Sequence, residues 1–266
     1  GIRVRAHDDD VEHSPLTREG LEQEVDAFLL PDPADDDPER RLRGEIALAP
    51  NVNDPGRSKP GQVESVLDHE DAVDAHTIAE SIGADPLMTL KLLSHVGTVS
   101  RRDTEVETVT AALVLMGVGP FFRTFSSLLT IEDLLGDLPE ALAGAHAVID
   151  RSHRAARFAL GFAAHRLDPD AAVLHEAALL HDFAELLLWC HAPGLALEIA
   201  RRQHADAALR SGDVQQAVLG ATLSAFQQAL MKSWRLPTML IRLDNDEHAE
   251  SSQVKNVLLA VRVARH

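Results

Sequence analysis

The chain has 266 residues, 45% of them hydrophobic and 25% charged, so it is long enough to bury a sizeable core and has a globular composition. The net charge of -17 argues against binding to nucleic acid, because contact with phosphate backbones relies on clusters of Lys and Arg. A single cysteine, Cys190, excludes an intramolecular disulfide, and no apolar run reaches the ~18 residues of a membrane helix. We therefore expect a cytoplasmic protein that contacts neither nucleic acid nor membrane.

Residues 1–70 form a distinct acidic segment. Within it, Thr17–Leu30 carries apolar residues at three- and four-residue steps, which predicts a helix. The alternating prolines and aspartates of residues 31–38 end this helix and favour an extended linker, because proline interrupts helices and like charges repel. The first ten residues lack the apolar core of a signal peptide.

From about residue 71 onward the pattern is helix after helix, without a convincing strand or an internal repeat, so the sequence predicts an all-α fold. One expected helix starts after Asp168–Asp170, carries His181 and Asp182, and stops near Ala192. The other expected helices cover residues 75–82, 87–96, 106–116, 119–135, 139–167, 195–203, 213–234 and 250–265. Gly97 is expected to close the second of them.

An abrupt polar pair, His181 and Asp182, interrupts the nearly all-apolar stretch Ala177–Trp189. The surrounding apolar spacing places the pair on or beside a buried face of one helix. A buried imidazole and carboxylate need partners, and adjacent His and Asp are typical of two ligands of a divalent metal. The alternative is structural: Asp182 forms an ion pair, His181 is satisfied in the core, and nothing is bound.

Four segments occur in order along the chain. Ile78–Leu93 reads as a helix, an Asp-Pro and a Leu-rich helix, and Val106–Gly117 reads as a further helix. Ala178–Leu186 contains Leu-Leu-His-Asp, and Trp234–Pro237 is a Trp-x-Leu-Pro turn. Together these segments resemble the HDOD family, the HD-related output domains of bacterial signalling proteins, in which Leu-Leu-His-Asp is followed by Ile-Gly. The resemblance implies a two-lobed helical bundle, with an N-terminal lobe over about residues 71–138 and an HD-like lobe over about 139–266.

The resemblance also implies a site related to that of HD phosphohydrolases, which bind metal through His, His-Asp and a distant Asp. His181 and Asp182 keep the central pair, whereas Arg151 stands at the place of the first His and Arg265 at that of the last Asp. Because arginine cannot coordinate a cation, we expect no cofactor and no metal. A metal, if present, would be held by His181 and Asp182. We expect instead that one or both guanidiniums face Asp182.

Other histidine positions also depart from the family. Leu223 stands where the family often has a His, and only His248 remains of a His-His pair that usually follows the Leu-Pro turn. We include His248 in the residual pocket. The remaining histidines lack ligand spacing and are predicted to be surface groups: His146, His165, His175, His191 and His204.

The sequence therefore predicts a non-catalytic regulatory module of bacterial signal transduction. Its residual pocket would bind a protein segment or a small anionic ligand through the following residues: Arg151, His181, Asp182, Arg265 and His248. One alternative is a metal-dependent HD phosphohydrolase acting on a nucleotide or other phosphoester, with His153, His175 or His248 supplying the missing ligands. Another is an assembly scaffold whose acidic N-terminal segment binds a basic partner.

Overall fold

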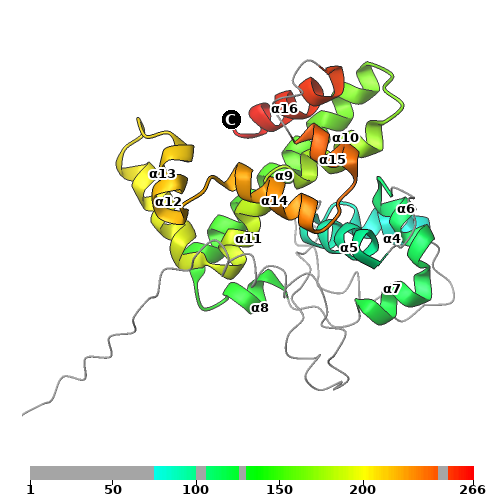
Figure 1. The fold of residues 1–266 in the computed structure, drawn as a ribbon, viewed down its shortest axis with the longest axis horizontal. Helices are drawn as coiled ribbons and strands as arrows, with labels where there is room; N and C mark the ends of the chain where they lie inside the picture. The colour runs from blue at the N-terminus through cyan, green and yellow to red at the C-terminus, as the bar shows by residue number, and fades with distance from the viewer. Residues whose placement is uncertain (1–74, 100–105, 126–129, 245–250) are drawn as a thin grey trace, which may run out of the picture.

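The computed structural model describes residues 75–99, 106–125, 130–244 and 251–266 (Figure 1). Every regular element in these ranges is a helix, which confirms the all-α prediction. The predicted helix Thr17–Leu30 and the acidic linker lie outside the described residues. No single helix in the described part of the chain is long and apolar enough to cross a membrane. Ala171–His191 and Pro193–Ala205 pass that test only as a pair, and the pair is bent by 115°.

Helix α5, whose residues from Pro86 to Ser94 are all buried, packs against α6. It starts at Asp85, whose Oδ1 accepts hydrogen bonds from the backbone N–H groups of Leu87 and Met88 at 2.9 and 3.0 Å. Pro86 occupies the first helical position, where no N–H is needed. The described helices before residue 139 are α4 (Ala75–Ile82), α5 (Pro86–Val99), α6 (Val109–Met116), α7 (Val118–Thr124) and α8 (Ile131–Leu135).

The longest described helix, α9 (Pro139–His165), is central to the C-terminal part and packs against α16, α10, α11 and α8 (Figure 1). Its buried face is rich in alanine, which lets the neighbouring helices approach closely. One continuous helix was predicted here over 139–167, and the structure confirms it to His165. The other helices are α10 (Ala171–Leu180), α11 (Phe183–His191), α12 (Pro193–Ala205), α13 (Ser211–Leu219), α14 (Leu223–Ser233), α15 (Thr238–Leu243) and α16 (Ser252–Ala264).

Three of the expected helices are interrupted, so the predictions of continuous helix there were wrong. The stretch 119–135 contains α7 and α8, with Thr130 capping the start of α8. The stretch 213–234 is divided into α13 and α14 at Gly220, which has a φ of 73° that a helix cannot accommodate. The helix expected to carry His181 and Asp182 is divided at that pair into α10 and α11.

Gly97 does not close α5, contrary to the prediction, because the helix continues to Val99. A Cβ atom at Gly97 would lie 2.5 Å from the carbonyl oxygen of Arg235 and 2.9 Å from that of Trp234. Glycine is therefore required by the close approach of the turn after α14, not by helix termination.

Polar contacts of Glu176 and His153 join the N-terminal helices to the C-terminal ones. Glu176 on α10 accepts a hydrogen bond from the backbone N–H of Val109 at 2.9 Å, at the first residue of α6. His153 on α9 bonds through Nε2 to the carbonyl oxygen of Ala84, just before α5. Both side chains are buried, so these contacts fix the position of α5 and α6 against the helices that build the site.

Candidate functional site

His181 and Asp182 form the turn between α10 and α11, and a glutamine on α14 holds this turn. Gln227 donates from Nε2 to the carbonyl oxygen of His181 at 2.6 Å and accepts from the backbone N–H of Ala184 at 3.0 Å. The carbonyl oxygen of Asp182 accepts a hydrogen bond from the backbone N–H of Leu186, and this bond belongs to the first turn of α11. The break in the helix places the Asp182 carboxylate against Arg151 of α9 and Arg265 at the end of α16.

Both carboxylate oxygens of Asp182 bond to arginine. Arg151 on α9 donates from Nε to Oδ2 at 2.7 Å, and Arg265 after α16 donates from Nη2 to Oδ1 at 2.9 Å. His181 Nδ1 lies 3.1 Å from the same Oδ1. Arg151 also donates from Nη2 to Glu185 Oε2 at 2.6 Å. These five residues are called the Asp182 cluster below, and they connect α9, α11 and the end of α16.

The charges of the cluster stabilise one another. Burial alone would raise the pKa of Asp182, but the hydrogen bond and charge of His181 and the charges of Arg151 and Arg265 hold that pKa well below its usual range. Burial alone would lower the pKa of His181, but the hydrogen bond and charge of Asp182 and the charge of Asp244 raise it above the ordinary value. The arrangement therefore favours an ionised Asp182 beside a protonated His181.

A third carboxylate, Asp244, lies beside this cluster. Its Oδ1 accepts from Gln227 Nε2 at 2.7 Å, and its Oδ2 accepts from Gln228 Nε2 at 2.8 Å. Burial raises the pKa of Asp244 to about 6, although the charge of His181 and both amides oppose the shift. Burial also raises the pKa of Glu185, against the opposing charge of Arg151. Both groups thus hold protons more tightly than a solvated carboxylate does.

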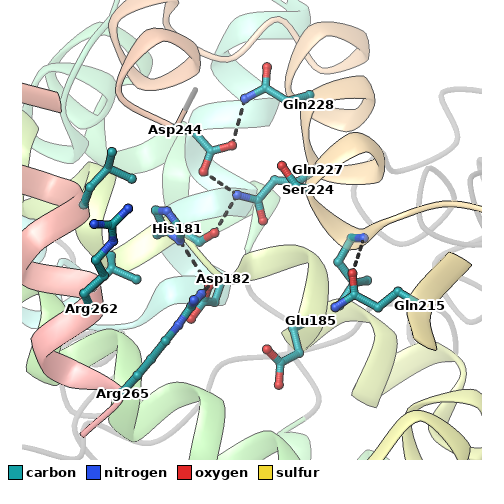
Figure 2. Close-up of a pocket in the computed structure, with 13 residues that line it drawn as sticks. His181, Asp182, Glu185, Gln215, Ser224, Gln227, Gln228, Asp244, Arg262 and Arg265 are labelled. Carbon is teal, nitrogen blue, oxygen red and sulfur yellow. Dashed lines mark hydrogen bonds and ion pairs between the residues drawn. The ribbon is translucent and has the colours of Figure 1, made fainter. Parts of the chain in front are cut away.

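A pocket of about 380 Å³ opens beside the Asp182 cluster (Figure 2). Its wall comes from the α10–α11 turn, α13, α14, the end of α15, and α16. Apolar side chains of α14 and α16 cover part of it, and polar and charged groups cover the rest. The lining residues are His181, Asp182, Glu185, Gln215, Leu223, Ser224, Gln227, Gln228, Asp244, Leu258, Val261, Arg262 and Arg265.

The structure brings together four of the five residues expected in the residual pocket: Arg151, His181, Asp182 and Arg265. Arg151 lies behind the pocket wall and does not line it. His248 lies outside the described residues. Among the histidines predicted to be surface groups, His165 and His204 are exposed, whereas His146, His175 and His191 are partly buried.

Sequence reasoning did not identify several polar residues of the site. Glu185 follows Asp182 by three residues, so it shares a helix face with it, and this spacing was a usable signal. Arg262 likewise precedes Arg265 by three residues. Gln227 and Asp244 carry no comparable pattern, because the folding of α14 and α15 against the α10–α11 turn brings them to the site.

The residues present do not fit an HD-type metal centre. Arg151 and Arg265 occupy the places of two ligands, and their guanidiniums donate to both oxygens of the remaining carboxylate. Of the histidines considered as substitutes, His153 bonds to Ala84 in the N-terminal part. Within the described ranges, no group of three or more His, Cys, Asp or Glu side chains is arranged to hold a metal ion.

This helical architecture, with a His-Asp turn between two helices of the C-terminal part, defines an HD-related domain. The HDOD domain family matches residues 61–250, and the chain belongs to that family. The match confirms the resemblance read from the four sequence segments. No curated protein matches the chain significantly in sequence.

Two solved structures have a similar fold. The response regulator MmoQ from Methylococcus capsulatus (fragment 20–298) is 19% identical and has a TM-score of 0.59, over 78% of this chain and 83% of that one. A virulence factor from Campylobacter jejuni is 17% identical and has a TM-score of 0.60, over 94% of this chain and 82% of that one. At these identities the likeness concerns the fold alone.

Proposed function

We propose that this chain is a non-catalytic regulatory module of bacterial signal transduction that acts in the cytoplasm by binding a protein partner or a small anionic ligand. One observation carries the proposal: Arg151 and Arg265 bond to both oxygens of Asp182. In an HD phosphohydrolase these two positions would hold metal ligands. A site built this way is suited to recognition, because the bound arginines take the place of the cation that would activate water.

The energetics of the cluster support this proposal. Asp182 is 9% exposed and Arg151 is 18% exposed, so their ion pair is shielded from water. A metal that reached Asp182 would have to displace the guanidiniums of Arg151 and Arg265 and break their charge-assisted hydrogen bonds to the buried carboxylate, which is costly. MmoQ, which has a similar fold, is a response regulator, and this supports a signalling role for the chain.

The alternative of a metal-dependent phosphohydrolase has one observation in its favour, since Glu185 and Asp244 add carboxylates near His181 and Asp182. Both groups are already bonded, Glu185 to Arg151 and Asp244 to two glutamine amides. Their raised pKa values also disfavour the ionised forms that a metal requires. These features favour the binding module over the enzyme.

A phosphodiesterase assay separates the two functions. The purified protein, supplied with Mn²⁺, is tested on bis(p-nitrophenyl) phosphate beside the Asp182→Ala variant. The proposal predicts that both release p-nitrophenol at the same background rate. Turnover by the wild-type protein that requires Mn²⁺ and is lost in Asp182→Ala would overturn the proposal and establish the hydrolase.

A further inference from the structure

The polar groups that line the pocket divide into those already bonded and those still available. The carboxylates belong to the first class: Asp182 bonds to two arginines and His181, Asp244 to two amides, and Glu185 to Arg151. The pocket's acceptors are therefore largely satisfied by the protein itself. A ligand seeking hydrogen-bond acceptors would find few here.

The available groups are donors. Arg262 is exposed, lines the pocket, and has no hydrogen-bond or ion-pair partner in the described part of the chain. Arg265 is 51% exposed and donates only to Asp182, so most of its N–H groups remain available. The Oε1 atom of Gln215 accepts from Leu223 N, while its Nε2 amide and the Ser224 hydroxyl have no partner among the described residues.

These donors lie on opposite sides of the pocket. Arg262 and Arg265 stand three residues apart at the end of α16, which puts them on one face of that helix. Figure 2 shows this pair on one side and Gln215 on the other, with Glu185 between Arg265 and Gln215. The two arginines and the two neutral donors thus line one pocket, from α13, α14 and the end of α16.

We propose that this pocket binds a phosphate monoester of a small organic molecule, with Arg262 and Arg265 holding the phosphate group. The inference rests on the proposed function and names the class of its ligand. A phosphate offers three peripheral oxygens as acceptors, which suits several donors arriving from different directions better than a planar carboxylate does. Arginine is also well matched to phosphate because its N–H groups can form paired bonds.

The size and the remaining lining account for the organic part of the ligand. A volume of about 380 Å³ falls within the range of small-molecule pockets and exceeds what an isolated phosphate ion needs. Leu223, Leu258 and Val261 supply apolar surface beside the donors. In a chain of net charge -17, this local group of arginines is the feature that favours an anion.

Isothermal titration calorimetry with inorganic phosphate, AMP and adenosine tests the assignment. We expect AMP to bind in competition with phosphate, and adenosine, which lacks the phosphate, not to bind. Arg262→Gln should weaken AMP binding by about tenfold, since it removes charge-assisted hydrogen bonds. Because Arg262 is exposed and has no partner in the described structure, this variant should retain the wild-type melting temperature.

Arg157→Gln is the matched control, since Arg157 is an exposed arginine of α9 outside the pocket and its replacement changes the net charge equally. Unchanged AMP affinity in this control supports the assignment. Equal weakening in both variants, undiminished binding by Arg262→Gln, or no binding of AMP and phosphate to the wild-type protein would overturn it. Failure of the proposed function is recognised separately, as Asp182-dependent turnover in the phosphodiesterase assay.

Discussion

Arg151 Nε donates to Asp182 Oδ2 at 2.7 Å, and this bond ties the middle of α9 to the turn between α10 and α11. The same carboxylate also receives Arg265, so one side chain connects α9, the α10–α11 turn and the end of α16. The α10–α11 turn and α16 also contribute to the pocket wall. Asp182 therefore stabilises the fold in addition to shaping the site.

Replacing Asp182 should destabilise the protein strongly. Asp182→Asn keeps the shape of the side chain but removes the negative charge that pairs with Arg151, Arg265 and His181, which should lower the unfolding free energy by about 3 kcal/mol. Urea denaturation at neutral pH measures the change. Asp137→Asn serves as the control, because Asp137 is exposed and makes no described contact. Equal stability of the two variants would contradict this role of the cluster.

The pKa of His181 should lie above that of an unfolded histidine, which is about 6.5. Asp182 and Asp244 favour the protonated form of His181. The stabilisation from His181 is therefore fully present at pH values below the pKa of the unfolded histidine, and it is lost as the pH rises through the pKa of His181 in the folded protein. NMR titration of the ring, assigned with His181→Gln, gives the value directly. In Asp182→Asn the pKa of His181 should fall, because the variant lacks the carboxylate charge that offsets the effect of burial. A pKa below the unfolded value in the wild-type protein would refute the expectation.

Glu176 should give the domain an unusual dependence of stability on pH. Burial raises the pKa of Glu176 to about 8, and Val109 N opposes this only in part. At pH values between the pKa of an unfolded glutamate, which is about 4.3, and the pKa of Glu176 in the folded state, the folded state binds more protons than the unfolded one. The unfolding free energy should therefore decrease as pH rises through this window.

Glu176→Gln should remove that dependence while keeping an oxygen to accept from Val109 N. We expect the variant to match the wild-type protein near pH 5 and to exceed its unfolding free energy near pH 8. Glu140→Gln, at an exposed position of α9, is the control and should leave the pH profile unchanged. Parallel profiles for all three proteins would show that Glu176 does not cause the effect.

Gly97 and Gly161 should respond in opposite directions to alanine. A Cβ at Gly97 would lie 2.5 Å from Arg235 O, so Gly97→Ala should force the turn away from α5 and lower the unfolding free energy by about 2 kcal/mol. Gly161, in α9, has nothing within 4 Å of a built Cβ. Gly161→Ala should therefore stabilise by about 0.5 to 1 kcal/mol through helix propensity. Thermal melts compare them, and destabilisation by both would contradict the packing argument.

The fold class was readable from the sequence because helical periodicity and N-terminal caps such as Asp85 are local signals. Helix interruptions were harder to predict. The break at His181 and Asp182 is stabilised by Gln227, which is distant from the pair in sequence, so no local pattern predicted the break. The role of Gly97 was mispredicted for a related reason, since the atoms that require glycine at this position belong to the turn after α14.

The site was partly predictable. The family pattern located Arg151 and Arg265 at former ligand positions, and these positions converge on Asp182. The pattern did not indicate which arginine stays available for a ligand. That distinction depends on burial and on existing bonds: Glu185 also engages Arg151, whereas Arg262 remains exposed beside Arg265.

The metal content of the purified protein tests the central claim most directly. Protein prepared without chelator, and an Asp182→Ala variant prepared alongside it, are analysed for Mn, Fe, Ni and Zn. If arginines have taken the place of the metal, both preparations should contain only background amounts. Roughly one equivalent of a transition metal per wild-type chain, lost in Asp182→Ala, would contradict the account and restore the metal-dependent hydrolase.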